Sequence, residues 1–134
     1  MTTILLVDDE RLVQRSMEKT LLRAGFEVMT ASDCRGAMET LESNAAKIDL
    51  GIFDLNIPNF EGVAVSIAGL DLLQKVLEKK PDLPIIVLTA YDEMSKAREA
   101  ISLGAKAYSV KGREQGLVEL IQGILSQKSE RGDL

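Results

Sequence analysis

The chain alternates short apolar runs with longer segments of helical spacing, and this alternation limits the folds that it can adopt. The first, third and fourth runs are apolar almost throughout, which is typical of central strands in a parallel sheet that is buried on both faces. The second and fifth runs are more mixed, which suits flanking strands. The predicted strands cover Thr3–Val7, Glu27–Thr30, Leu50–Phe53, Pro84–Leu88 and Ala107–Val110.

The segments between these strands carry apolar residues at the spacing of amphipathic helices. The first stripe runs from Leu12 to Leu21, and the clearest one runs from Leu117 to Leu125. Five strand–helix alternations predict a parallel sheet with right-handed crossovers and helices on both faces. Ligands of such sheets bind beyond the carboxyl ends of the strands, so the residues that follow each strand are the first candidates for a functional site.

Length and composition indicate one domain with its own core. The chain has 134 residues, of which 46% are apolar, and its single cysteine, Cys34, cannot form an internal disulfide. We predict one folded domain over residues 1–128 and a polar tail over 129–134. No apolar run could cross a bilayer and the N-terminus lacks the basic start of a signal peptide, so we expect a cytoplasmic protein with no membrane partner.

Charge and the missing histidine exclude several functions. The net charge is −5, which disfavours direct nucleic-acid binding because such binding depends on Lys and Arg that neutralise phosphates. The chain contains no histidine, so Ser-His and Cys-His nucleophile pairs and histidine zinc sites are excluded. Carboxylates, hydroxyls and lysines must therefore carry any chemistry.

Polar residues follow four of the five predicted strands. Each has an ordinary structural interpretation when it is taken alone, such as a helix cap, a turn residue or a solvated lysine. Together they place several reactive groups at the same edge of the sheet. They are Asp8, Asp9 and Glu10 after the first strand, Asp54 after the third, Thr89 after the fourth and Lys111 after the fifth.

The carboxylates predict a divalent cation and a nucleophile at this edge. Clustered carboxylates repel one another, and Mg²⁺ or Mn²⁺ relieves this repulsion because hard cations take oxygen ligands. An aspartate beside such a cation can accept a phosphoryl group and form an aspartyl-phosphate. Lys111 adds a second positive charge, and Thr89 can donate a hydrogen bond to a phosphoryl oxygen.

At this point the sequence resembles the receiver domains of bacterial two-component response regulators. The resemblance rests on four segments in order, which together span nearly the whole chain. It implies a flavodoxin-like, doubly wound parallel sheet of five strands in the order 2-1-3-4-5, with five helices in a three-layer sandwich. The segments are ILLVDDE (4–10), FDLNIPNFEG (53–62), PIIVLTA (84–90) and GAKAYSVK (104–111).

The resemblance also implies roles for the residues that bind metal and phosphate. Asp54 matches the phosphoacceptor, and Lys111 matches the lysine that contacts the phosphoryl group. Asp8 and Asp9 match the acidic metal pair, with Asp9 favoured as the direct ligand. Asn56 matches the position whose backbone carbonyl completes the metal site, together with Asp54 itself.

The family's switch is implied at two further positions. Thr89 matches the residue that moves to the phosphoryl group, and Tyr108 matches the aromatic ring that follows it inward. The surface formed by the fourth helix, the fifth strand and the fifth helix would then read out the change. The resemblance implies a phosphoacceptor that assists its own phosphorylation and dephosphorylation, rather than an enzyme with turnover. Its partners would be a histidine kinase or histidine phosphotransfer protein, and a downstream target, an output domain or a second copy of the chain.

Two departures from the family pattern fall near the predicted site. Gly112 stands where the family usually has a proline after a cis peptide bond, so we expect a trans or flexible junction after Lys111. A small, apolar segment over Val63–Ala68 reads as an insertion between the phosphoacceptor loop and the third helix. We hypothesise that this insertion alters access to Asp54.

Three other functions stay open from the sequence. An aspartate-nucleophile phosphatase would need a second aspartate where the chain has Asn56. A flavin-binding domain would need a phosphate loop where the acids Asp8 and Asp9 would repel the phosphate. A receiver fold used only for protein association is disfavoured by the intact acid cluster.

Overall fold

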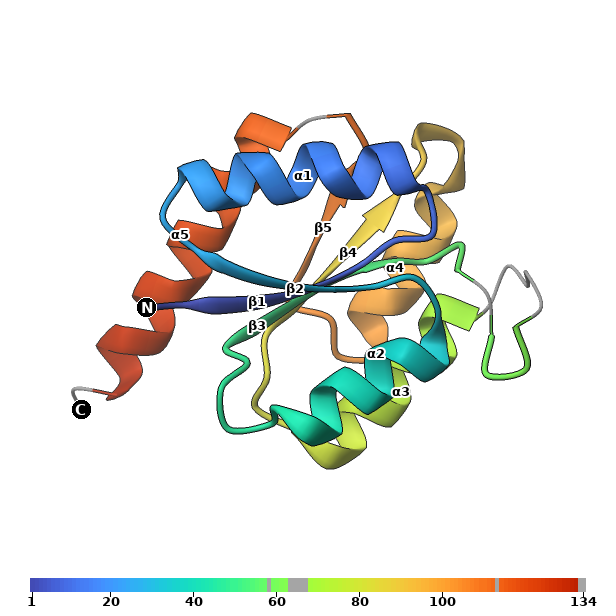
Figure 1. The fold of residues 1–134 in the computed structure, drawn as a ribbon, viewed down its shortest axis with the longest axis horizontal. Coiled ribbons are helices and arrows are strands. Elements are labelled where there is room, and N and C mark those ends of the chain that lie inside the picture. The colour runs from blue at the N-terminus through green and yellow to red at the C-terminus, as the bar shows by residue number, and fades with distance from the viewer. Residues whose placement is uncertain (58, 63–67, 113, 133–134) are drawn as a thin grey trace.

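Five parallel strands form one sheet in a computed structural model that describes residues 1–57, 59–62, 68–112 and 114–132. The order across the sheet is β2-β1-β3-β4-β5, which confirms the order implied by the resemblance. All neighbouring pairs are parallel (Figure 1). The strands are β1 (Thr3–Val7), β2 (Glu27–Ala31), β3 (Leu50–Asp54), β4 (Ile85–Thr89) and β5 (Ala107–Val110).

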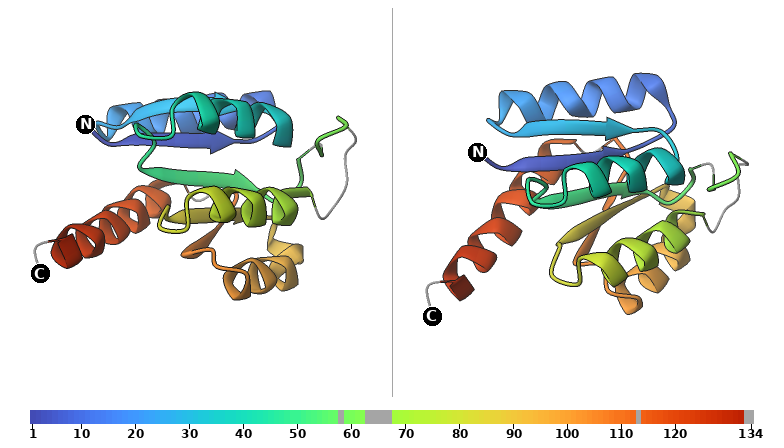
Figure 2. Two further views of the ribbon diagram at one scale, coloured as in Figure 1. Left: turned by 90° about the horizontal axis from the view of Figure 1, so that it is seen from below. Right: turned by 60° about the horizontal axis from the view of Figure 1, so that its bottom comes forward.

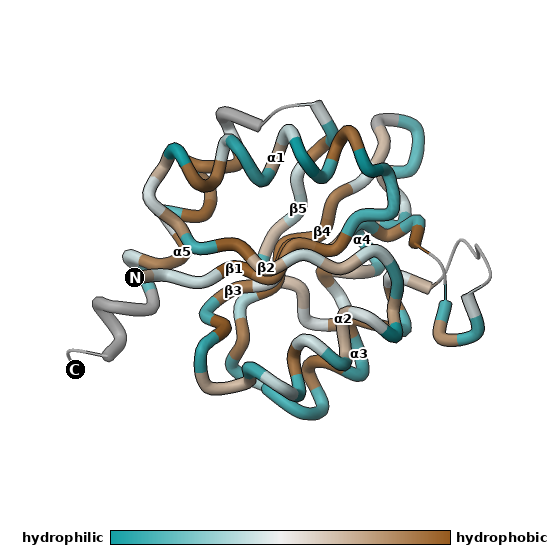
Figure 3. The backbone as a smooth tube through the Cα atoms, in the orientation of Figure 1, coloured by the Kyte–Doolittle hydropathy of each residue, from teal (hydrophilic) through white to brown (hydrophobic). Residues whose placement is uncertain are grey.

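Burial follows the apolar content of each strand. Every residue of β1, β3 and β4 is buried, whereas β2 and β5 are mostly half-buried or exposed. The central strands have helices on both faces, and the edge strands have less apolar surface to cover. Figure 3 shows the hydrophobic colour concentrated in the middle of the sheet. The sequence prediction of central and flanking strands is therefore confirmed.

Helices cover the sheet on both faces and complete three layers (Figures 1 and 2). α1 and α5 lie on one face, and α2, α3 and α4 lie on the other. Successive residues of β1 point to opposite faces, so Ile4 and Leu6 enter the core under α1 and α5, while Leu5 and Val7 enter the other core. The helices are α1 (Arg11–Arg23), α2 (Cys34–Ser43), α3 (Ala68–Lys79), α4 (Met94–Ser102) and α5 (Glu114–Gly132), and a short 3₁₀ turn covers Tyr91–Glu93.

Two details of the helices differ from the sequence prediction. The prediction that Leu12 lies on the apolar stripe of α1 is wrong, because Leu12 is 81% exposed. At 100° per residue Leu12 lies far around the helix from the buried Met17, whereas Val13 lies four residues from Met17 and packs inward. In addition, α5 continues to Gly132, into the predicted tail, so the domain boundary at residue 128 stays a prediction.

In the part of the chain that the structure describes, no helix combines the length and the apolar character that a bilayer crossing needs.

Gly69 allows α3 to begin directly against the end of β3. Its backbone N–H donates to the carbonyl oxygen of Leu55 at 3.1 Å. A Cβ at this position would lie 2.4 Å from Leu55 Cα and 2.8 Å from the carbonyl oxygen of Asp54, closer than real Cβ atoms come. Only glycine fits this approach without movement of the segment that carries Asp54.

We predict that Gly69→Ala destabilises the fold by about 2 kcal/mol or more, because the added methyl group must displace backbone rather than a flexible side chain. Gly123→Ala is the matched control, since nothing lies within 4 Å of a Cβ there. It should be neutral or stabilising by up to about 1 kcal/mol, the helix propensity difference. Urea unfolding of both variants checks this, and equal stability of the two would contradict the role of Gly69.

Candidate functional site

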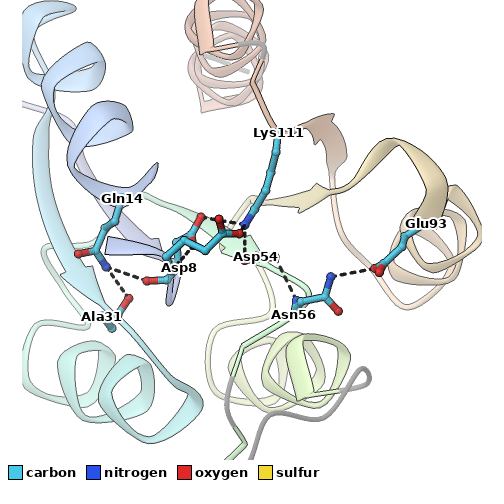
Figure 4. A network of polar contacts seen from close by, with 8 residues as sticks. Asp8, Gln14, Ala31, Asp54, Asn56, Glu93 and Lys111 are labelled. Atoms are coloured by element: carbon cyan, nitrogen blue, oxygen red, sulfur yellow. Dashed lines mark hydrogen bonds and ion pairs between the residues drawn. The ribbon is translucent and has the colours of Figure 1, made fainter. Parts of the chain in front are cut away.

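Asp8 anchors the first part of the site at the end of β1. Its side chain is fully buried, and its Oδ1 accepts a hydrogen bond from the backbone N–H of Glu10 at 2.9 Å. Its backbone is tied to the neighbouring loop by Gln14, whose Nε2 donates to the carbonyl oxygens of Asp8 (3.0 Å) and Ala31 (2.9 Å) (Figure 4). The position of this carboxylate is therefore fixed through both its side chain and its backbone.

Asp54 ends β3 and faces the same edge. It is 1% exposed, and its Oδ1 accepts from the backbone N–H of Asn56 at 3.0 Å. Its Oδ2 accepts from Nζ of Lys111 at 2.7 Å. The parallel pairing of β3 with β1 on one side and β4 on the other places this carboxylate between the acids after β1 and Thr89.

Lys111 follows β5 and joins the acids through one ammonium group. Its Nζ lies 2.6 Å from Oε1 of Glu10, 2.7 Å from Oδ2 of Asp54 and 3.4 Å from Oδ2 of Asp8. No described peptide bond is cis, which confirms the expected trans junction before Gly112. Gly112 has a φ of +93°, which proline cannot adopt. The lysine therefore reaches the acids without the family's usual junction.

Burial and charge shift the pKa values of these groups. Burial raises the pKa of Asp54 to about 6, although hydrogen bonds from Lys111 and Asn56 oppose the shift. Burial also raises the pKa of Asp8. For Lys111, burial alone would lower the pKa, but its hydrogen bonds to Asp54 and Glu10 and the surrounding negative charge outweigh this and raise it. The lysine therefore stays charged, while the buried carboxylates are costly to ionise.

The acids are suited to a divalent cation. Asp8, Glu10 and Asp54 each offer a carboxylate oxygen, and these oxygens lie within 4.8 Å of one another. Oδ2 of Asp8 is buried and has no hydrogen-bond partner among the described residues. A hard cation supplies the positive charge that this oxygen-rich group needs, so the residues fit Mg²⁺ or Mn²⁺.

The composition of this acidic group differs from the sequence prediction in one residue. Asp9, the predicted direct ligand, is exposed and lies outside the group of three, so its role stays a prediction. Glu10 lies in the group, although the sequence analysis gave it no role. The only sequence signal for Glu10 was its place as the third consecutive acid after a strand.

The two predicted switch residues differ in burial. Thr89 is buried, and its hydroxyl donates to the carbonyl oxygens of Glu93 (3.0 Å) and Ala90 (3.2 Å). Tyr108 is 43% exposed on β5. The strand pairing nevertheless places both near the site, because Thr89 pairs with Val110 and Tyr108 with Val87.

A second polar network connects the loop after β3 to the start of α4, and the sequence analysis missed it. Nδ2 of Asn56 donates to Oε2 of Glu93 at 2.8 Å (Figure 4). Nζ of Lys96 lies 3.1 Å from the same oxygen. The hydrogen bonds from Asn56 and Lys96 lower the pKa of Glu93. Since Glu93 also accepts the hydroxyl of Thr89 on its backbone, it links a predicted metal-site residue to a predicted switch residue.

The predicted insertion falls mostly outside the described residues. Of Val63–Ala68, the structure describes only Ala68, which is buried in the first turn of α3. Its carbonyl oxygen accepts a hydrogen bond from Sγ of the buried Cys34 at 3.4 Å. The hypothesis that the insertion alters access to Asp54 stays untested.

We predict that Asp54→Asn stabilises the metal-free protein at pH 8 and not at pH 4. The folded pKa of Asp54, about 6, lies above its ordinary value of 3.8, so its contribution to stability is full below 3.8 and is lost as the pH rises through 6. At pH 8 the free energy of unfolding should rise by up to about 3 kcal/mol, at about 1.4 kcal/mol per pKa unit. Loss of the contact between Asp54 and Lys111 reduces this increase.

Urea unfolding between pH 4 and pH 8 with a chelator present measures this difference. Asp82→Asn is the control, because it also removes one carboxylate, but from an exposed position at the other end of the strands. A difference for Asp54→Asn that does not grow with pH would contradict the proposed cost of ionising this group.

Comparison with known proteins agrees with this geometry. Residues 4–122 match the family model of the response regulator receiver domain. The chain is 32% identical over 119 residues to the response regulator protein FleR of Pseudomonas aeruginosa, covering 88% of the chain and 23% of FleR. It is 33% identical over 108 residues to the alkaline phosphatase synthesis transcriptional regulatory protein PhoP of Bacillus subtilis, covering 81% of the chain and 41% of PhoP.

The same family appears among solved structures. A response regulator receiver domain protein from Clostridium thermocellum superposes with a TM-score of 0.86 at 27% identity, covering 96% of the chain and 98% of that protein. The chain thus spans less than half of either curated relative, and it matches their receiver part. The chain belongs to the receiver domains of two-component response regulators, which are switch domains rather than classical enzymes.

Proposed function

We propose that Asp54 accepts a phosphoryl group from a phosphohistidine of a histidine kinase or phosphotransfer protein. The observation that carries this proposal is the buried Asp54 carboxylate, which is held beside Asp8 with its Oδ2 2.7 Å from Nζ of Lys111. One Asp54 oxygen attacks the phosphorus, the P–N bond to the partner's imidazole breaks, and the imidazole leaves with the bonding electrons. The product is an aspartyl-phosphate.

The neighbouring residues supply positioning and charge for this transfer. Asp8, Asp9, Asp54 and the backbone carbonyl of Asn56 are the proposed ligands of Mg²⁺ or Mn²⁺. The bound ion would offset the charge of the carboxylates and of the phosphoryl oxygens. Lys111 places its ammonium where a phosphoryl group on Oδ2 of Asp54 would need it. The chain thereby assists its own phosphorylation and, with a water as the nucleophile, its dephosphorylation.

The position of Asn56 favours a switch over a phosphatase. Its backbone N–H is held by Asp54 and its amide by Glu93, and an amide cannot act as a general acid or base. The conformation of Thr89 and Tyr108 fits the unphosphorylated form of such a switch, with the hydroxyl turned to Glu93 and the ring exposed. On phosphorylation Thr89 would turn to the phosphoryl group and Tyr108 would move inward.

The proposed readout surface comprises α4, β5 and α5. Ile101 on α4 and Tyr108 on β5 are exposed large apolar residues there, at 40% and 43%. We propose that this surface binds a downstream protein target, an output domain or a second copy of the chain. With a net charge of −5, the chain is not proposed to bind nucleic acid itself, and the proposed location is the cytoplasm.

We expect the wild-type chain to gain the mass of one phosphoryl group when it is incubated with a small-molecule phosphodonor and Mg²⁺. Asp54→Asn should gain none, and a chelator should strongly slow the wild type, because the clustered acids then lack their counter-charge. Intact-protein mass spectrometry measures both. No gain in the wild type, or equal gains in the two proteins, would refute the proposed function.

We also expect phosphorylation to bury Tyr108 through Thr89. Thr89→Val keeps the shape of the side chain but removes the hydroxyl, so it should still accept a phosphoryl group while Tyr108 stays exposed. NMR of isotope-labelled tyrosine rings follows this in the wild type and the variant, and Tyr108→Phe assigns the signal. An inward shift of equal size in both proteins would show that the Thr89 hydroxyl does not drive the ring.

A further inference from the structure

Glu10 contacts the ammonium of Lys111 from the loop that follows β1. It precedes α1 as the N-cap residue, yet its side chain makes no capping hydrogen bond. Its Oε1 instead lies 2.6 Å from Nζ of Lys111, the shortest of that ammonium's three carboxylate contacts. The side chain is 60% exposed, so core packing does not dictate this orientation.

A backbone hydrogen bond anchors Lys111 at the end of β5. The backbone N–H of Lys111 donates to the carbonyl oxygen of Thr89 at 3.1 Å, which fixes the end of β5. On the other side Gly112 has a φ of +93°, and a Cβ there would meet no atom within 4 Å. The four-carbon stem of a lysine is flexible. The stem can reach several positions, so the three carboxylate contacts select the position of the ammonium.

Of these carboxylates, Glu10 is the exposed one, whereas Asp8 and Asp54 are buried and are among the proposed ligands of the cation. Asp8 and Asp54 each accept a backbone N–H on Oδ1. Glu10 also offers an oxygen to the three-acid group, so contact with the cation is the alternative to its contact with Lys111. A phosphoryl group on Oδ2 of Asp54 would also turn the oxygen that Lys111 now contacts into the bridging oxygen of the aspartyl-phosphate. Glu10 is exposed and is not the proposed phosphoacceptor, so its contact with Lys111 can persist when Asp54 is phosphorylated.

We propose that Glu10 is a positioning residue, which holds the ammonium of Lys111 beside Asp54 for phosphoryl transfer. The proposal rests on the proposed function, because it gives Glu10 a role through Lys111 in the same reaction. It differs from a role as a metal ligand, which would act on the cation whether or not Lys111 is present. It also differs from a purely structural role, because loss of a structural contact would not act specifically on the environment of the Lys111 ammonium.

A double-mutant cycle separates these roles. Rates of phosphorylation by a small-molecule donor are measured for the wild type, Glu10→Gln, Lys111→Met and the double variant, with the Mg²⁺ dissociation constant of each protein. We expect Glu10→Gln to slow the wild type about fivefold, the upper end of the range for an exposed ion pair. It should have no effect when Lys111 is already methionine. Glu42→Gln is the control, because it removes an exposed ion pair to Lys79 of similar length, 2.9 Å, away from the site.

A spectroscopic readout follows the ammonium itself. ¹⁵N NMR of lysine side chains in the metal-free protein should show a shifted Lys111 Nζ signal in Glu10→Gln and an unshifted one in Glu42→Gln. High salt should move the wild-type signal toward that of Glu10→Gln, because the pair is partly exposed. A Lys111 signal that Glu10→Gln leaves unchanged would overturn the proposal.

The kinetic outcomes are equally decisive. Equal slowing by Glu10→Gln with and without Lys111, or a weaker Mg²⁺ affinity in both backgrounds, would overturn the proposal and indicate a metal ligand. A wild-type rate in Glu10→Gln would overturn it while leaving the proposed function intact. No phosphorylation of the wild type would refute the proposed function, and the role of Glu10 in transfer with it.

Discussion

The contact between the buried Asp54 carboxylate and the Lys111 ammonium is the interaction on which the site depends. Asp54 is nearly inaccessible to water, so its charge is tolerated only with compensation nearby. One ammonium serves three carboxylates, those of Asp54, Asp8 and Glu10, and this leaves negative charge in excess. Burial is the main cause of the raised pKa of Asp54 and of Asp8, and repulsion from the neighbouring acids adds to it. Binding of a further cation would therefore stabilise such a site, even before any reaction takes place.

The sheet creates this situation by bringing strand ends together from distant parts of the chain. Asp8 and Lys111 are held at one edge because β1, β3, β4 and β5 are parallel and adjacent in that order. The close approach of α3 at Gly69 and the bonds from Gln14 then fix the loops that carry Asp54 and Asp8. The acids are therefore brought together by packing and backbone hydrogen bonds, and their mutual repulsion is opposed by the rest of the fold.

The sequence was sufficient where apolar pattern or residue chemistry decides the outcome. The buried strands follow from unbroken runs such as Ile4–Val7, and the acid cluster follows from the rule that parallel strands end at one edge. Strand order came from the resemblance, not from the pattern. The exposure of Leu12 depends on which way α1 faces, and the contacts of Glu10 and Glu93 depend on loop conformations and side-chain rotamers. No local sequence signal determines these features.

The excess of negative charge would also repel an incoming phosphoryl group. It would bring further negative charge into a group where Asp8, Glu10 and Asp54 already lie within 4.8 Å of one another. Among the described residues, Lys111 is the cation that contacts these acids. Its ammonium would have to balance the charge of the phosphoryl oxygens as well as that of the carboxylates. Because a lysine has a flexible stem, its ammonium could follow either group. The contact of Glu10 lies outside the buried pair of Asp8 and Asp54, and it would limit the positions that the Lys111 ammonium can take. The ammonium would then stay close to the phosphoryl group on Asp54.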